Sequence, residues 1–183
     1  MSKSNCPTMK HVLRGNNCTE HLAGLGMTVY VGLKKDLTAP LTADENTYGT
    51  PSFKPGTGLY KIDGKRESQK YGWSSLGFQK GYELTGTFIN EVQDENSAKV
   101  DRALNNLDIF LIFKDDEKSL ILYDENRPLE ADSGGIAGDT GAAAEDDRQT
   151  QYEFKLKPCK YTRLYVTEPT EGWDSLLDDE DSD

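Results

Sequence analysis

Histidine and cysteine are scarce in this chain of 183 residues, which has two histidines and three cysteines. The cysteines are odd in number and form no Cys-x-x-Cys pair, which argues against a disulfide framework. Cys6, His11, Cys18 and His21 offer the ligand types that zinc prefers, but their spacing fits no common zinc module. We therefore expect the protein to need neither a metal ion nor another cofactor.

The sequence also lacks long apolar runs and an excess of positive charge. No stretch approaches the roughly 20 apolar residues of a membrane span, and the N-terminal residues lack the apolar core of a secretory signal. We expect synthesis in the cytoplasm and no contact with a membrane. The formal net charge is −11, and nucleic-acid affinity comes mainly from Lys and Arg. We therefore expect no specific DNA binding, although a polyanion can slide along an acidic surface without sticking.

Signatures of catalysis are missing as well. The chain contains no Gly-x-Ser-x-Gly, no His-Glu-x-x-His and no phosphate-binding loop. Carboxylates cluster in Asp115–Glu117 and Glu145–Asp147, among turn residues and other charges. General acid–base work needs a desolvated carboxylate with a raised pKa, and such surroundings do not supply one. The sequence favours solvated turns here and predicts no enzyme.

Short apolar runs separated by turn residues make up most of the remaining chain. The alternating or wholly apolar pattern predicts strands at 27–33, 81–90, 108–113, 120–124, 149–156 and 161–168. Asp63-Gly64 predicts a tight hairpin turn, because Asp-Gly readily adopts the positive φ angles that such a turn requires. The proline- and glycine-rich residues 38–57 predict a long loop.

One helix is predicted within residues 95–107. Asn96 or Ser97 can cap its N-terminus. The apolar residues that share one face are Val100, Ala103, Leu104 and Leu107. Seven or eight strands with one short flanking helix and long loops predict a mainly β fold, an antiparallel β-sandwich or barrel.

The chain has the length of one domain with a sizeable core. We place that domain at residues 25–170, between a flexible segment at 1–24 and an acidic tail at 171–183. Trp173, Leu176 and Leu177 can anchor the start of the tail.

Residues 132–147, "DSGGIAGDTGAAAEDD", lead directly into the predicted strand 149–156. Asp132 and Asp139 offer oxygen ligands for calcium, but their spacing matches no calcium loop. A segment of glycine, alanine and acidic residues buries too little apolar area to hold a shape alone. We expect neighbouring subunits to order it. The residues assigned to this subunit interface are Asp132, Asp139, Glu145, Asp146, Asp147 and Arg148.

The order of these elements resembles the major tail (tail tube) proteins of tailed bacteriophages, in particular those of phages and prophages of gut Bacteroidetes. The resemblance covers residues 25–170 and rests on three phrases, "ELTGTF" (83–88), "LNNLDIF" (104–110) and "EDDRQTQYEF" (145–154). It implies a virion protein of the tail whose hexameric rings stack into a tube. It also implies inner strands of all subunits forming a barrel around the DNA lumen, and tape-measure and tail-terminator proteins as partners.

A different class of function fits the same composition. Tyr48, Tyr71, Trp73 and Phe78 are expected on loops and could together form a stacking platform. The alternative prediction is therefore a β-sandwich module that binds a carbohydrate or a protein. Rings or tubes in solution would favour the first reading, and a monomer with a saturable ligand would favour the second.

Overall fold

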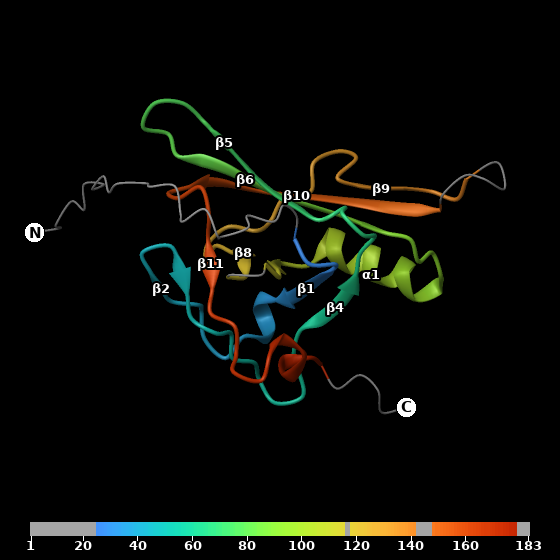
Figure 1. Cartoon of the computed structure of the whole chain (residues 1–183), viewed down its shortest axis with the longest axis horizontal. Helices are drawn as coiled ribbons and strands as arrows, with labels where there is room; N and C mark the ends of the chain where they lie inside the picture. The colour runs from blue at the N-terminus through green and yellow to red at the C-terminus, as the bar shows by residue number, and fades with distance from the viewer. Residues whose placement is uncertain (1–24, 116–117, 142–147, 179–183) are drawn as a thin grey trace, which may run out of the picture.

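The structure, a computed structural model, describes residues 25–115, 118–141 and 148–178 of the chain. Within these residues the fold is a β-sandwich of two sheets with one α-helix (Figure 1). The expectation of a mainly β fold with a single short helix is confirmed. Eleven strands are present in the described residues, more than the sequence predicted, because several strands are only two to four residues long.

The larger sheet has seven strands in the order β2-β3-β11-β8-β7-β1-β4. Its neighbours are antiparallel except for β11 and β3, which run parallel. The strands are β1 (Thr28–Leu33), β2 (Ala43–Asp44), β3 (Thr47–Tyr48), β4 (Tyr60–Asp63), β7 (Ile109–Phe113), β8 (Leu120–Leu122) and β11 (Tyr165–Val166). A short 3-10 turn, η1 (Lys34–Asp36), follows β1.

The smaller sheet has four antiparallel strands in the order β5-β6-β10-β9. Its strands are β5 (Lys70–Ser75), β6 (Tyr82–Asn90), β9 (Ile136–Asp139) and β10 (Gln149–Cys159). Figure 1 shows this sheet as a layer above the seven-stranded sheet, with the β5–β6 and β9–β10 hairpins extending in opposite directions.

The core lies between the two sheets. All five residues of β7 are buried, as its wholly apolar sequence predicts for a central strand. In β10, Tyr152, Phe154 and Leu156 alternate with more exposed polar residues and face the core. Phe88 of β6 stacks on Tyr152 at 4.6 Å between ring centroids. The apolar residues of the alternating pattern in β10 therefore form part of the inner face of the smaller sheet.

Helix α1 (Glu95–Asn106) connects β6 to β7 and lies beside the β9–β10 end of the smaller sheet (Figure 1). Its N-cap is Asp94, not Asn96 or Ser97 as predicted. The Asp94 carboxylate accepts from the Ser97 backbone N–H at 2.7 Å, and Ser97 Oγ accepts from the Asp94 N–H at 2.9 Å. Leu104 is buried, whereas Leu107 follows the helix and is 41% exposed.

The predicted hairpin at Asp63-Gly64 is wrong. β4 ends at Asp63 and pairs with β1, while β5 begins only at Lys70. A Cβ at Gly64 would lie 1.8 Å from the Gln69 Nε2, so the end of that side chain would have to move if the glycine were replaced. Of the predicted strand 161–168, only Tyr165–Val166 is a strand.

The expectation that residues 132–147 have no structure of their own is wrong for Ile136–Asp139. These residues form β9 and pair with β10 in the same subunit. Ile136 is half-buried against the core, and the Glu153 N–H donates to the Gly135 carbonyl at 2.6 Å. The packing of Ile136 on the core and the backbone pairing with β10 therefore hold residues 136–139 in place.

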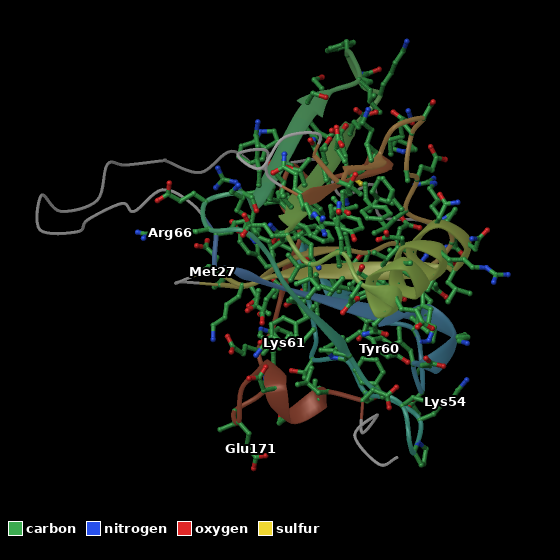
Figure 2. The ribbon with its side chains drawn as sticks, turned by 90° about the vertical axis from the view of Figure 1, so that its right-hand side faces the viewer. Met27, Lys54, Tyr60, Lys61, Arg66 and Glu171 are labelled. Carbon is green, nitrogen blue, oxygen red and sulfur yellow. The ribbon has the colours of Figure 1, made fainter. Side chains whose placement is uncertain are left out.

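Residues 171–178 of the predicted tail are described, and this segment packs onto the domain. The expectation that Trp173 can anchor the start of the tail is confirmed. Trp173, in the 3-10 turn η2 (Trp173–Leu176), is 1% exposed, and its indole N–H donates to Ser119 Oγ at 2.9 Å. Figure 2 shows Lys61 of β4 next to η2, where its Nζ lies 3.3 Å from the Asp174 carboxylate.

Candidate assembly surface

The outer strands of the smaller sheet, β5 and β9, each have a strand partner on one side only within the described residues. Their directions follow from the pairing. Each step from β5 to β6, β10 and β9 is antiparallel, so β9 runs opposite to β5. A second copy placed beside β9 in the same orientation would present its β5 antiparallel to that strand.

Hydrogen-bond alternation identifies which backbone groups are available at these edges. The Glu153 N–H donates to the Gly135 carbonyl, and the Leu76 N–H donates to the Gly81 carbonyl. Because bonded and non-bonded pairs alternate along an antiparallel ladder, the N–H groups of Ile136 and Gly138 face away from β10. By the same alternation, the N–H group of Trp73 faces away from β6. Both edges therefore offer the donors and acceptors that strand addition uses.

The outer face of the smaller sheet is polar and nearly balanced in charge. Charged residues that alternation places on it are Lys70, Glu83, Asp139, Glu153, Lys155 and Lys157. Ion pairs join several of them: Lys157 lies 3.3 Å from Glu83, and Lys155 lies 3.5 Å from Glu153. Threonines occupy the centre of this face in β6. The acidic excess of the whole chain is thus not concentrated on the described part of this surface.

The structure separates the residues that the sequence assigned to one interface. Asp132 lies beside the middle of β10, where its carboxylate accepts from Lys155 Nζ at 2.6 Å. This hydrogen bond, with the charge of the ammonium group, lowers the pKa of Asp132. Asp139 ends β9, and Arg148 is exposed just before β10. Glu145, Asp146 and Asp147 lie outside the described residues.

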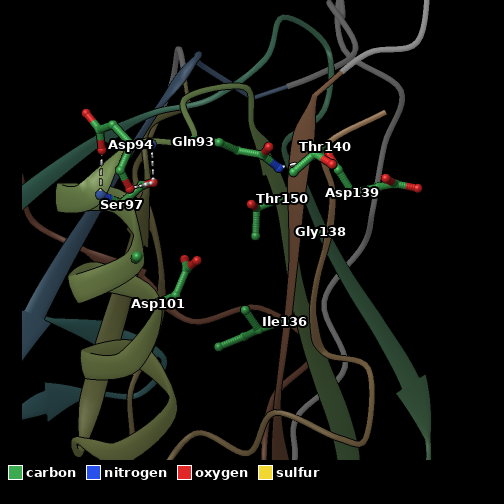
Figure 3. Close-up of a pocket in the computed structure, with 10 residues that line it drawn as sticks. Gln93, Asp94, Ser97, Asp101, Ile136, Gly138, Asp139, Thr140 and Thr150 are labelled. Carbon is green, nitrogen blue, oxygen red and sulfur yellow. Dashed lines mark hydrogen bonds between the residues drawn. The ribbon is translucent and has the colours of Figure 1, made fainter. Parts of the chain in front are cut away.

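A crevice of about 390 Å³ separates the first turns of α1 from the β9–β10 hairpin (Figure 3). Its two helix carboxylates already have structural partners: Asp94 caps the helix, and Asp101 accepts a short hydrogen bond from the Tyr152 hydroxyl. Burial and then the bond to Asp101 raise the pKa of Tyr152. Asp94 and Asp101 are therefore engaged in capping and packing α1, whereas Gln93 Oε1, buried in the same crevice, has no hydrogen-bond partner among the described residues.

Other reactive groups in the described residues are also engaged. Cys159 is buried, and burial raises the pKa of its thiol to about 11, so the thiol stays protonated and unreactive at neutral pH. No three His, Cys, Asp or Glu side chains converge in a metal-binding arrangement within 25–115, 118–141 and 148–178. The zinc-type residues Cys6, His11, Cys18 and His21 lie outside these ranges.

The predicted four-residue aromatic platform is wrong. Tyr71 is buried in β5, where its hydroxyl donates to the Ile121 carbonyl at 3.3 Å, and Tyr48 packs edge-on against Tyr123. Only Trp73 and Phe78 are exposed, at 45% and 89%. Tyr71 and Trp73 lie on the same face of β5, but Tyr71 packs into the core, whereas Trp73 lies two residues further along the strand, where Arg163 covers its ring. A loop assignment could not reveal this difference.

A second groove, of about 310 Å³, lies where the β5 edge faces β8 and β11. Arg163 covers the Trp73 ring there, with its guanidinium carbon 4.4 Å from the ring centroid. Gln69 and Tyr165 also line the groove. The sequence singled out Trp73 but not its partner Arg163, because the two residues are far apart along the chain and share no motif.

Comparison of the chain with protein-family models, with curated proteins and with solved structures finds no match. Within the described residues, no helix has the length and apolar character needed to cross a membrane. What the molecule itself defines is a β-sandwich whose smaller sheet has two open, oppositely directed edges and a polar outer face.

Proposed function

We propose that this chain is a structural subunit of a phage tail tube, in which the smaller sheets of neighbouring copies join edge to edge into a closed ring. The observation that carries the proposal is the opposite direction of β5 and β9. A head-to-tail contact of this kind repeats with every copy and removes both open edges once the ring closes. A structural role of this kind requires no catalytic residue.

The relative positions of the two edge strands support a barrel in particular. Counted along β10, β9 lies level with Gln149–Tyr152, and Lys70 at the start of β5 lies level with Glu153. If Asp139 is paired with Lys70 of the next copy, that copy is shifted by about four residues across four strands, or one residue per strand. A shear of one residue per strand accompanies a strand tilt of roughly 36° in closed barrels. In this register, the offset of β5 and β9 along β10 supports a closed barrel.

Charge and polarity at the same surfaces agree with this arrangement. Antiparallel pairing places the end of β9, with Asp139, beside the start of the next copy's β5, with Lys70. The outer face of the sheet, polar and nearly neutral, would line the lumen, and it offers few free cations to hold DNA. The resemblance noted above implies hexameric rings stacked in the virion tail, with tape-measure and tail-terminator proteins at the ends.

The test is assembly of the purified full-length chain, observed by negative-stain electron microscopy and light scattering. Gly138→Pro removes an N–H group that faces away from β10, so it blocks strand addition at that edge. Gly138→Ala is the matched control, because it adds the same Cβ near Thr150 Oγ1, at 3.0 Å, and keeps the N–H. We expect rings or tubes from the parent and from Gly138→Ala, and monomers from Gly138→Pro.

Both variants are also melted in the same buffer. Equal melting temperatures would show that the loss of assembly is an edge effect. Rings formed normally by Gly138→Pro would refute pairing through β9, and a parent that stays monomeric at high concentration would refute the proposed function.

A further inference from the structure

Two hollows lie on the core-facing side of the smaller sheet, one beside each open edge. Ile136 of β9 lines the crevice next to α1, and Trp73 of β5 lines the groove next to β8 and β11. Ile136 is paired with the buried Tyr152, and Trp73 with the buried Leu84, so both side chains lie on the inner side of the sheet. Joining β9 of one copy to β5 of the next therefore brings the crevice of one copy and the groove of the other to the same seam.

The register that pairs Asp139 with Lys70 places Trp73 directly opposite Ile136 of the neighbouring copy. The N–H groups of Trp73 and Ile136 both face away from their own sheets, so the two residues can exchange both backbone hydrogen bonds. Their side chains then lie side by side, with about 5 Å between Cβ atoms, and an aromatic ring beside a β-branched side chain is a favourable cross-strand pair. Backbone pairing and side-chain packing are therefore both satisfied in this register.

The crevice contains acceptors for which the described residues supply no cation. Figure 3 shows Asp101 of α1 and Ile136 of β9 pointing into the crevice from opposite sides. The Asp101 carboxylate accepts from the Tyr152 hydroxyl but forms no ion pair within the described ranges. Gln93 Oε1 is buried there without a hydrogen-bond partner among the same residues. No described lysine, arginine or histidine lines the crevice, so it lacks a positively charged donor.

The groove contains the complementary groups. Arg163 lies over the Trp73 ring, with its guanidinium carbon 4.4 Å from the ring centroid, and forms no ion pair with another described residue. Asp115 also lines the groove but is engaged in an interaction of its own. Trp73 remains 45% exposed although Arg163 covers its ring. Arg163 therefore has N–H donors, and Trp73 has apolar surface, available to a second molecule.

We propose that Trp73 and Arg163 of one copy close the crevice of its neighbour, with Trp73 packed on Ile136 and Arg163 paired with Asp101. The inference rests on the proposed edge-to-edge ring and names the side-chain contacts that hold its seam. Backbone pairing alone does not distinguish a second copy of this chain from another exposed strand, whereas these two contacts do. The crevice and the groove are thus the two halves of one interface.

Fluorescence quenching by acrylamide tests the burial of Trp73, because the chain has two tryptophans and Trp173 is only 1% exposed. The full-length parent is measured below and above the concentration at which rings form. We expect the quenching of Trp73 to fall severalfold on assembly. Trp73→Phe is the matched control, and its remaining tryptophan should be quenched weakly and equally in both states.

Assembly of charge variants tests the contact between Arg163 and Asp101. Arg163→Gln and Asp101→Asn should each raise the concentration needed for half-assembly by about tenfold, and the double variant should lose little more. Asp101→Asn keeps an acceptor for the Tyr152 hydroxyl, so these variants should melt close to the parent as dilute monomers. Lys160→Gln and Glu95→Gln are the matched controls and should assemble like the parent, because each neutralises an exposed charge outside the two hollows.

The outcomes separate this inference from the proposed function. Rings in which Trp73 is quenched as strongly as in the monomer would overturn the inference while the ring stands. Rings formed by Arg163→Gln and Asp101→Asn as readily as by the parent would do the same. Strong protection of Trp73 in the dilute monomer would also overturn it, because the indole would then be covered within one chain. A parent that forms no rings at any concentration refutes the proposed function, and this docking with it.

Discussion

Gly32 and Phe110 lie directly opposite each other on β1 and β7, and the phenyl ring covers the glycine. A Cβ at position 32 would lie 2.0 Å from Phe110 Cζ. The ring fills the space that a side chain at 32 would occupy and itself stacks on Phe53 at 6.4 Å. The packing of β1 against β7 therefore depends on the absence of a side chain at position 32.

Gly32→Ala should therefore destabilise the domain by about 1–3 kcal/mol, because the buried ring must move out of a filled core. Urea unfolding followed by tyrosine and tryptophan fluorescence measures the change. Gly32→Ala should lower the free energy of unfolding by less in a Phe110→Leu background than in the parent, because the smaller side chain leaves room for the added methyl group. Strictly additive effects would show that the ring and the glycine are not coupled.

Leu104 is the fully covered residue of α1, and Leu107 just after the helix is its partly exposed neighbour. Leu104→Asp should cost several kcal/mol, since it places an unpaired charge between helix and sheet. Soluble yield and thermal melting measure the effect. Leu107→Asp is the matched control and should cost far less. Equal melting of the two variants would contradict the packing of this helix face.

Trp173 and Trp73 differ sharply in burial, at 1% and 45% exposed. Trp173→Ala should cost roughly 3–5 kcal/mol, because it empties a core site and leaves the Ser119 hydroxyl without its indole donor. Trp73→Ala should change the melting temperature little. Chemical denaturation of both variants decides the point, and a Trp173→Ala protein as stable as the parent would show that the tail segment is not part of the domain.

Tyr30 donates a hydrogen bond to the Asp174 carboxylate at 2.8 Å, and Lys61 lies near the other oxygen. The hydrogen bonds of Tyr30 and Lys61 lower the pKa of Asp174. Stability from a lowered carboxyl pKa is present above the unfolded pKa of about 3.9 and is lost as the pH falls through the folded value.

Asp174→Asn should therefore lower the melting temperature at neutral pH by a small amount, consistent with an exposed pair. The difference from the parent should shrink to nothing as the pH is taken below the lowered pKa. Tyr30→Phe should show the same pH dependence, and the two changes should not add. A difference that persists unchanged in acid would assign the effect to packing.

The fold class and most long strands could be predicted from the sequence because their patterns are local. The alternation of Tyr152, Phe154 and Leu156 places one face of β10 in the core, and the unbroken apolar run of β7 indicates burial on both faces. The spacing of Val100 and Leu104 marks α1 in the same way. Each of these signals lies within about ten residues.

The candidate site was harder to predict, because its parts meet through contacts between distant segments. A reading of glycine and aspartate content missed β9, since the backbone of β10, and not its own composition, gives that strand a partner. Asp132 and Asp139 were assigned together, yet the pairing register sends them to different levels of β10. Trp73 and Arg163 belong to no shared pattern at all.

The sequence by itself determined which stretches become strand or helix, because hydrophobic periodicity and capping act between near neighbours. Only the tertiary structure decided that β5 and β9 are the two edges of one sheet, that they run in opposite directions, and that they are offset along β10. The physical reason is that strand order and register are set by long-range backbone pairing and core packing between segments tens of residues apart, and composition within a segment carries no record of its partner.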